Sequence, residues 1–177
     1  MTESRKICYI LRHAKARPGR AGELDSERPL TPRGIRDARQ IAQYMAARGY
    51  RPNLVLCSAA FRTRETLANM IGLLPPSMRI ETTDSLYMAG SRTLLRCLQR
   101  LDEQTGTVLL IGHNPGLADL AAELAGQGEP ADVTRIREKF PTCALACLDL
   151  GITAWATLTP GTGRLTDLAY PRDLDED

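Results

Sequence analysis

Short apolar runs alternate with amphipathic stretches along most of this chain. Runs compatible with β-strands occupy residues 6–11, 54–57 and 107–111, and a weaker one occupies residues 79–82. Between and after them, residues 32–48, 58–73, 91–101 and 114–124 carry apolar side chains at helical spacing. This alternation predicts an α/β fold, with a mostly parallel central sheet between two helical layers. Two further runs, residues 144–150 and 154–158, flank Gly151 and predict an antiparallel hairpin.

Capping residues mark the expected helix boundaries. Thr31 and Pro32 are favourable as N-cap and first residue of the first helix, and Gly49 is suited to its end. The next three helices have candidate N-caps at Ser58, Ser91 and Asn114. The sequence therefore predicts where the helices start as well as which faces they bury.

The composition is typical of a globular protein with one domain. The chain has 177 residues, of which 43% are hydrophobic and 25% are charged, and its net charge is only +2. We expect one domain over residues 1–170 and a disordered acidic tail at residues 171–177. The near-neutral charge argues against nucleic acid as a partner. No stretch approaches the roughly 18 apolar residues of a membrane span, and the start lacks a signal-peptide pattern, so we expect a cytoplasmic protein without membrane partners.

Five cysteines at irregular spacing indicate neither a disulfide framework nor a zinc site. We therefore expect no metal site and no cofactor.

The chain contains only two histidines, and each follows an apolar run. His13 comes after the first predicted strand, within YILRHAKA, and His113 follows residues 107–111, within LLIGHNPGL. In α/β sheets, ligands bind at the carboxyl ends of the strands, so both imidazoles should lie at one edge. Arg12 precedes His13, and Arg62 follows the strand at residues 54–57. Strand-end geometry therefore predicts that two imidazoles and two guanidinium groups converge.

This set of side chains suits a phosphoryl group. Guanidinium groups bind phosphate oxygens in a fork, and the free amides of helix N-termini attract anions. A neutral imidazole can attack phosphorus, and neighbouring arginines keep it neutral by lowering its pKa. Taken singly, a histidine at a strand end is more often a polar surface residue, so the residues alone leave both interpretations open.

The same residues resemble motifs of the histidine phosphatase superfamily, which has the phosphoglycerate mutase-like fold. LRHAKA resembles the family's first histidine motif, with Ala14 in place of the usual glycine. CSAAFRTRET resembles its Ser-x-x-x-Arg-x-x-x-Thr element at Ser58, Arg62 and Thr66, and IGHNPGL resembles its second histidine block. The alanine, the short chain and the segments RPLT and FPTCALA resemble the SixA-type phosphohistidine phosphatase branch.

The resemblance implies a phosphatase that needs no metal ion and forms a covalent phosphohistidine. In this interpretation His13 is the nucleophile, Arg12 and Arg62 bind the phosphoryl oxygens, and His113 completes the phosphate pocket and stabilises the transition state. The implied substrate is phosphohistidine on a signalling or phosphotransfer protein. Two alternatives remain: a phosphatase of the same fold for a sugar, nucleotide or cofactor phosphate, and a non-catalytic phosphate-binding module.

The general acid is the least defined part of the predicted site. Larger members of the family use a carboxylate after the third strand, where this chain has only Asp84, within TTDSLYMAG. The alternative for Asp84 is a residue that caps a loop. A labile P–N bond needs less help from an acid than an ester does, so the lack of a glutamate here favours phosphohistidine.

The chain also has little room for a lid over the pocket. The loop at residues 14–31 carries Lys15, Arg17, Arg20 and Arg28. We therefore expect a shallow pocket with a basic rim, open to a phosphorylated protein side chain.

Overall fold

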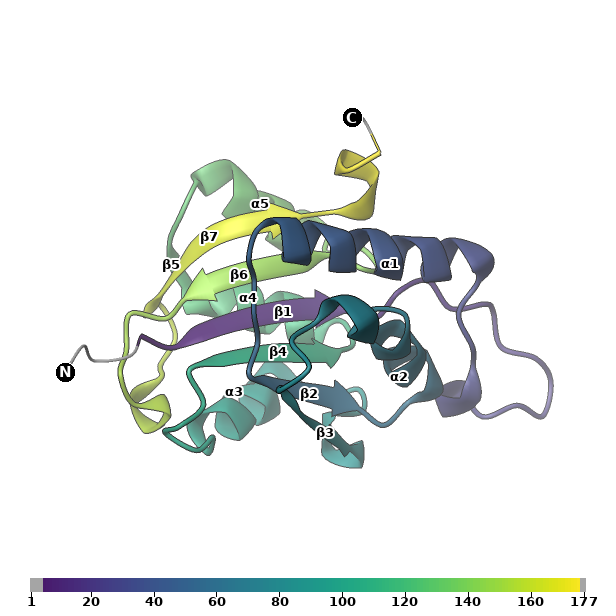
Figure 1. Cartoon of the computed structure of the whole chain (residues 1–177), viewed down its shortest axis with the longest axis horizontal. Coiled ribbons are helices and arrows are strands. Elements are labelled where there is room, and N and C mark those ends of the chain that lie inside the picture. The colour runs from purple at the N-terminus through teal and green to yellow at the C-terminus, as the bar shows by residue number, and fades with distance from the viewer. Residues whose placement is uncertain (1–4, 176–177) are drawn as a thin grey trace.

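The computed structural model describes residues 5–175, which form a sheet covered by helices on both faces (Figure 1). The strands are β1 (Ile7–Arg12), β2 (Leu54–Ser58), β3 (Arg79–Thr83), β4 (Thr107–Gly112), β5 (Ala125–Gln127), β6 (Leu145–Asp149) and β7 (Gly163–Ala169). The α-helices are α1 (Pro32–Ala47), α2 (Phe61–Ala68), α3 (Ser91–Gln99), α4 (Gly116–Leu124) and α5 (Pro130–Glu138).

The strands form one sheet in the order β3-β2-β4-β1-β6-β7-β5. β1, β2, β3 and β4 run parallel, whereas β6 is antiparallel to both of its neighbours, β1 and β7. The predicted three-layer α/β fold, with a mostly parallel sheet and a terminal antiparallel hairpin, is confirmed. Because β1, β4 and β2 lie side by side and run in one direction, their carboxyl ends meet at one edge.

The second strand of the hairpin is not the predicted one. Within residues 154–158, Trp155–Thr157 forms a short 3-10 helix, and the buried Trp155 donates its indole N–H to the Thr105 carbonyl at 2.7 Å. β7, at residues 163–169, pairs with β6 instead. Its sequence includes Arg164 and Asp167, so it is a less conspicuous apolar run than the segment that was predicted to be the strand.

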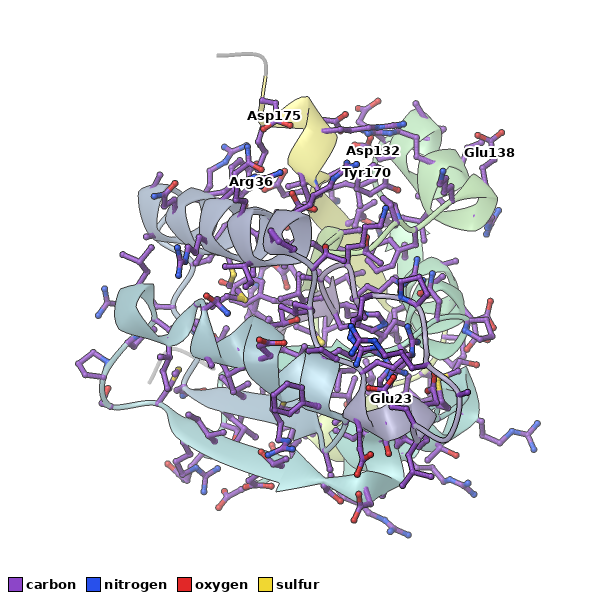
Figure 2. All side chains as sticks on the ribbon, turned by 90° about the vertical axis from the view of Figure 1, so that its right-hand side faces the viewer. Glu23, Arg36, Asp132, Glu138, Tyr170 and Asp175 are labelled. Carbon is purple, nitrogen blue, oxygen red and sulfur yellow. The ribbon has the colours of Figure 1, made fainter. Side chains whose placement is uncertain are left out.

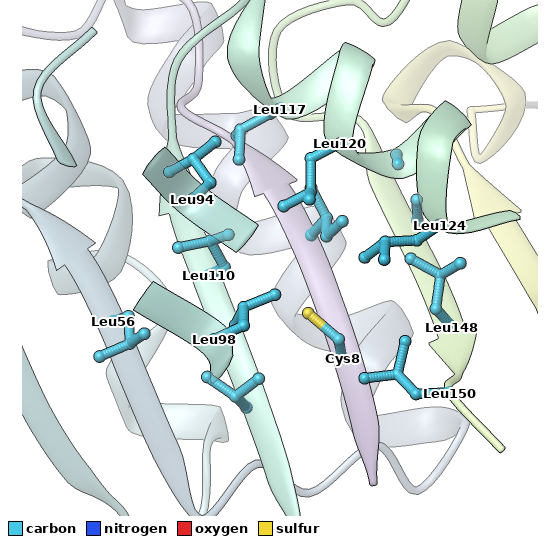
Figure 3. Packing of buried hydrophobic residues seen from close by; sticks show 14 of the residues in the cluster. Cys8, Leu56, Leu94, Leu98, Leu110, Leu117, Leu120, Leu124, Leu148 and Leu150 are labelled. Atoms are coloured by element: carbon cyan, nitrogen blue, oxygen red, sulfur yellow. The ribbon is translucent and has the colours of Figure 1, made fainter. Parts of the chain in front are cut away.

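Alternate residues of the central strands face two separate cores. Cys8 of β1 and Leu110 of β4 belong to the core beneath α3, α4 and α5 (Figure 3). Tyr9 and Leu11 belong to the core beneath α1 and α2. Strands buried on both faces are typical of parallel sheets. Truncation of a fully buried leucine such as Leu120 to alanine would lower the free energy of unfolding by about 2–5 kcal/mol.

Two glycines allow close backbone approaches near the carboxyl ends of the strands. A Cβ at Gly34, in the first turn of α1, would collide with the Lys15 carbonyl, and one at Gly116, at the start of α4, would collide with the Ala89 carbonyl. Thr31 caps α1 as predicted, since its hydroxyl accepts from the Gly34 N–H at 3.0 Å and donates to the Lys15 carbonyl at 3.1 Å. These contacts hold the loop after β1 against α1 and the segment before α3 against α4.

The other predicted N-caps are wrong. The helices α2, α3 and α4 have no side-chain cap, and their N-cap residues are Ala60, Gly90 and Pro115. Ser58 is instead the last residue of β2, where its hydroxyl has a different partner, described below.

The expected disordered tail does not begin at residue 171. Pro171–Asp173 forms a 3-10 helix in which Pro171 is buried, while residues 176 and 177 lie outside the described residues. Within residues 5–175, every helix is too short or too polar to cross a membrane.

Candidate active site

Four predicted site residues converge at the carboxyl edge of the sheet. Arg12 ends β1 and His13 follows it, His113 follows β4, and Arg62 lies in the first turn of α2 just after β2. All four line one cavity of about 370 Å³. Figure 2 looks onto this edge, toward which the arrowheads of β1, β2 and β4 point in Figure 1. The structure therefore brings together the two imidazoles and two guanidinium groups.

The buried imidazole of His13 is held by a backbone carbonyl. Its Nδ1 lies 2.7 Å from the Ala14 carbonyl oxygen, which can only accept, so Nδ1 carries the proton. Arg62 donates its Nε–H to His13 Nε2 at 3.3 Å, so Nε2 presents a lone pair. Burial, together with the charges of the neighbouring Arg62 and Arg12, lowers the pKa of His13 to about 3. His13 is therefore a neutral imidazole with its Nε2 lone pair facing the cavity wall formed by Arg62.

The imidazole of His113 faces the same guanidinium through its other nitrogen. Nδ1 lies 3.3 Å from Arg62 Nη2, which can only donate, and Nε2 lies 2.7 Å from the Ser58 hydroxyl. The neutral ring therefore donates its Nε2–H to Ser58. Burial and then the charge of Arg62 lower the pKa of His113 to about 4. The centroids of the two imidazoles are 5.3 Å apart.

Arg62 links the two imidazoles to Asp25, a carboxylate that is not among the predicted site residues. Arg62 Nη1 donates to the Asp25 backbone carbonyl at 2.7 Å, and Nη2 donates to the Asp25 carboxylate at 3.0 Å. One edge of the guanidinium is thus bound by Asp25, while the Nε and Nη2 edge faces both histidines. The donors of that edge contact the two imidazoles in this structure, and the same pair of donors forms a fork of the kind that binds two phosphoryl oxygens.

Asp25 also joins two parts of the cavity rim. It accepts hydrogen bonds from Arg28 Nε at 2.9 Å and from the Tyr87 hydroxyl at 2.5 Å. The hydrogen bond from Tyr87, followed by the contacts with the two arginines, lowers the pKa of Asp25 to about 2. The ring of Tyr87 lies edge-on to His113, with 5.4 Å between centroids. Asp25 therefore holds the loop after β1 against the segment before α3.

Arg12 contributes the second guanidinium. Its Nη1 donates to the Phe140 carbonyl at 3.0 Å, and Asn114 donates to the same oxygen at 2.7 Å. Within the described part of the chain, only two buried side-chain polar atoms lack a hydrogen-bond partner, namely Arg12 Nε and Asn114 Oδ1. Both residues line this cavity. Unused hydrogen-bonding capacity is therefore concentrated around the candidate site.

The Ser-x-x-x-Arg-x-x-x-Thr spacing has a structural explanation. Ser58 contacts His113, Arg62 contacts both imidazoles, and Thr66 accepts the backbone N–H of Ala14 at 3.0 Å. The Thr66 hydroxyl in turn donates to the Arg62 carbonyl at 2.7 Å. Residues four apart along the end of β2 and the start of α2 thus hold both histidine segments in place.

Asp84 is not among the residues that line this cavity. It lines a separate hollow of about 460 Å³ together with Phe61, Arg64 and Tyr87. The carboxylate that does line the histidine cavity is Asp25. Asp25 lies three residues before the RPLT segment, in a loop with no periodic pattern. Tyr87 lies in the same TTDSLYMAG segment as Asp84, and no local pattern marks it as a partner of Asp25.

Sequence comparison relates the chain to one family of enzymes. Residues 8–87 match the model of the histidine phosphatase superfamily, branch 1. An uncharacterised protein of Mycobacterium tuberculosis is 39% identical over 165 residues, which cover 92% of this chain and 100% of that protein. The phosphohistidine phosphatase SixA of Escherichia coli K12 is 31% identical over 145 residues, covering 80% of this chain and 84% of that protein.

Solved structures extend this similarity to the fold. An Agrobacterium tumefaciens protein assigned as a phosphohistidine phosphatase SixA superposes with a TM-score of 0.81 at 32% identity, covering 94% of this chain and 99% of that one. A protein histidine phosphatase SixA complexed with tungstate superposes with a TM-score of 0.76 at 28% identity, covering 95% and 99%. The similarity therefore spans nearly the whole of both chains.

Proposed function

The chain belongs to the histidine phosphatase superfamily, in its SixA-type branch, and from this premise we propose that it hydrolyses phosphohistidine on a signalling or phosphotransfer protein through a phosphorylated His13. Membership of the family makes it a phosphatase. The observation that carries the finer proposal is the position of Arg62, whose Nε and Nη2 face one unprotonated nitrogen of each imidazole. A phosphoryl group that takes these two donors over from the imidazoles would lie beside both rings and would leave the lone pair of His13 Nε2 free to attack.

In the proposed first step, His13 Nε2 attacks phosphorus. The new N–P bond forms as the bond to the leaving imidazole breaks, and that imidazole takes the bonding pair. When its second nitrogen already carries a proton, it leaves as a neutral ring. The Nδ1–H of His13 stays hydrogen-bonded to the Ala14 carbonyl. Arg12, Arg62 and His113 would stabilise the charge on the phosphoryl oxygens.

Water completes the proposed cycle. It attacks the phosphorus of phosphorylated His13, and the bond from phosphorus to Nε2 breaks with its electron pair returning to the ring. Both hydrogens of the water leave with the product as dihydrogen phosphate. His13 is then again the neutral Nδ1–H form that the Ala14 carbonyl stabilises.

The state of Asp25 supports a P–N bond as the bond that is cleaved. Its hydrogen bonds with Tyr87, Arg28 and Arg62 hold its pKa near 2, so it is ionised at neutral pH and has no proton to give. An alkoxide leaving group needs a general acid, whereas a protonated phosphohistidine supplies a neutral leaving group by itself. A site whose lining carboxylate is Asp25 therefore suits phosphohistidine better than a phosphate ester.

The test is turnover with chelator present. Wild-type protein and His13→Ala are incubated in EDTA with a phosphohistidine-bearing protein and with p-nitrophenyl phosphate, and rapidly quenched samples are examined by mass spectrometry at high pH. We expect the wild type to release phosphate from the phosphoprotein and to carry phosphate on His13, and the variant to do neither. Absence of turnover with both substrates, or full activity in the variant, would contradict the proposal.

A profile of kcat/KM over phosphometabolites separates this proposal from the small-molecule alternative. Faster hydrolysis of a sugar, nucleotide or cofactor phosphate than of phosphohistidine would replace the proposed substrate. Phosphate binding without trapped phosphate or turnover would indicate the non-catalytic module. The setting we propose for the reaction is the cytoplasm.

A further inference from the structure

Two hollows continue the histidine cavity along the side of the molecule that α1 forms. The cavity shares Thr142 with a hollow of about 220 Å³, which in turn shares Arg33 and Asp37 with a third hollow of about 550 Å³. The three concavities therefore adjoin one another. We call the two outer hollows the basic groove, because their linings contain five cationic residues: Arg33, Arg36, Arg39, Lys139 and Arg172.

Positive charge is in clear excess within the basic groove. Its lining contains only two carboxylates, Asp37 and Asp175, although the whole chain has a net charge of just +2. Asp37 pairs with Arg33 at 3.7 Å, and Asp175 accepts a hydrogen bond from Gln40 at 2.8 Å. Arg36, Arg39 and Lys139 are exposed, and none of them forms a salt bridge with another residue of the range 5–175. These three side chains are available to an anionic partner.

On the opposite rim of the cavity, two of the cationic side chains are paired with carboxylates. Arg17 forms a salt bridge with Glu23, and Arg28 forms one with Asp25, so the loop after β1 neutralises these two cations with its own carboxylates. Arg17 and Arg28 belong to the basic rim that the sequence predicted. Lys15 and Arg20 of the same loop are exposed and form no salt bridge within residues 5–175. Unpaired cations therefore lie on both rims, and the basic groove adds Arg36, Arg39 and Lys139 on the α1 side.

We propose that the basic groove binds an acidic segment of the phosphorylated protein substrate while the phosphoryl group enters the histidine cavity; this inference rests on the proposed function. Arginine forks bind carboxylates in a bidentate manner, and several such contacts hold an extended acidic chain. The part of α1 from Arg33 to Gln43 is about 15 Å long, which matches four or five extended residues. Figure 2 shows Arg36 and Tyr170 on the face that contains the carboxyl edge of the sheet.

A protein segment fits this groove better than a nucleic acid. Tyr170 is the aromatic residue of the lining, and it is only 2% exposed, with its hydroxyl donating to the Lys139 carbonyl at 2.9 Å. Single-stranded nucleic acids are held largely by bases stacking on exposed aromatic rings. The groove therefore offers guanidinium and ammonium groups to carboxylates, and no aromatic surface for bases.

The test compares two synthetic peptides that differ in flanking charge. Each contains one phosphohistidine, flanked by glutamates in one peptide and by glutamines in the other. We expect kcat/KM to be about tenfold higher for the glutamate peptide at low salt, and this advantage to disappear at about 0.5 M salt. The advantage should also disappear in Arg36→Glu/Arg39→Glu. The matched control is Arg92→Glu/Arg96→Glu, which makes the same charge change on α3. This control should retain the higher kcat/KM for the glutamate peptide.

Two further measurements separate this inference from the proposed function. Turnover of phosphoramidate, which has no flanking residues, reports on the histidine cavity alone and should be equal in all of these variants. Fluorescence anisotropy with unphosphorylated peptides reports on the groove without any turnover. If phosphoramidate and both phosphopeptides are inert, the proposed function fails. Even then, tighter binding of the glutamate peptide would support an acidic-segment site in the basic groove, provided that the tighter binding is lost only in Arg36→Glu/Arg39→Glu. Equal binding of the two peptides, an equal effect of the α3 control, or tighter binding of a single-stranded oligonucleotide would overturn the inference.

Discussion

His13 and His113 follow equivalent apolar strands and face the same guanidinium, but their second ring nitrogens have different partners. His13 Nδ1 meets a backbone carbonyl, whereas His113 Nε2 meets the Ser58 hydroxyl. A carbonyl can only accept, so it holds His13 in one tautomer with its lone pair on Nε2. A hydroxyl can donate or accept, so Ser58 supports both tautomers of His113. The surroundings of the two rings, rather than the residue type, make one suited to attack phosphorus and the other suited to donating to a phosphoryl oxygen.

The most severe test of this difference is removal of each ring. His13→Ala should lower kcat/KM by about 10⁴-fold or more, because no nucleophile remains to form the covalent intermediate. His113→Ala should lower it by about 10²- to 10³-fold, because one donor to the transition state is lost. Single-turnover assays with quenched mass spectrometry should still find phosphate on His13 in the second variant. Phosphate on His113 in the wild type or in His13→Ala would reverse the assignment.

The next test concerns the carboxylate that holds Arg62 between the rings. Asp25→Asn should lower kcat/KM by about tenfold, because the neutral amide weakens the charge-assisted bond that aims Arg62 at both imidazoles. Asp84→Asn is the matched control, since Asp84 lines a separate hollow, and it should stay within about twofold of the wild type. A larger loss in Asp84→Asn than in Asp25→Asn would restore Asp84 as the candidate acid.

The contrast between Asp25 and the histidines also shows what the sequence could predict. His13, His113 and Arg62 lie at the ends of apolar runs, and the geometry of parallel strands brings such positions together in any sheet of this kind. Asp25 lies in a loop without periodicity, and it reaches the site only through hydrogen bonds with residues of α2 and the segment before α3. Local patterns contain no information on such contacts, so neither Asp25 nor its partner Tyr87 was predictable.

The same limit of local sequence patterns explains why the second strand of the hairpin differs from the predicted one. The run at residues 154–158 is apolar because it buries Trp155 beneath α3, and burial of that kind does not require a strand. The actual strand, β7, has Arg164 and Asp167 among its residues. Hydrophobicity indicates burial at residues 154–158, but the strand lies in the next segment, at residues 163–169.

A smaller effect is expected when the hydroxyl beside His113 is removed. Ser58→Ala leaves the Nε2–H of His113 without its partner in a buried position, so the ring loses the hydrogen bond that orients it, and kcat/KM should fall by about fivefold. Nitrogen-15 NMR should show a changed signal for Nε2 of His113, while the spectrum of His13 stays unchanged. A change in both rings would mean that Ser58 acts on the whole site rather than on His113.

The smallest expected effect is on stability in acid, and it compares the rings as titrating groups. Burial lowers the pKa of His13 to about 3, whereas an unfolded histidine titrates near 6.5. Between those values the unfolded chain binds a proton that the folded chain does not, so the free energy of unfolding decreases as the pH falls.

His13→Gln removes this titration. Between about pH 7 and about pH 5.7, the wild type should lose roughly 1 kcal/mol more than this variant in urea unfolding. His113→Gln should flatten the same curve, because the pKa of His113 is also lowered, to about 4. Parallel curves for the wild type and His13→Gln would mean that His13 titrates normally in the folded protein. In that case its Nε2 would not be the desolvated lone pair that sets His13 apart from His113.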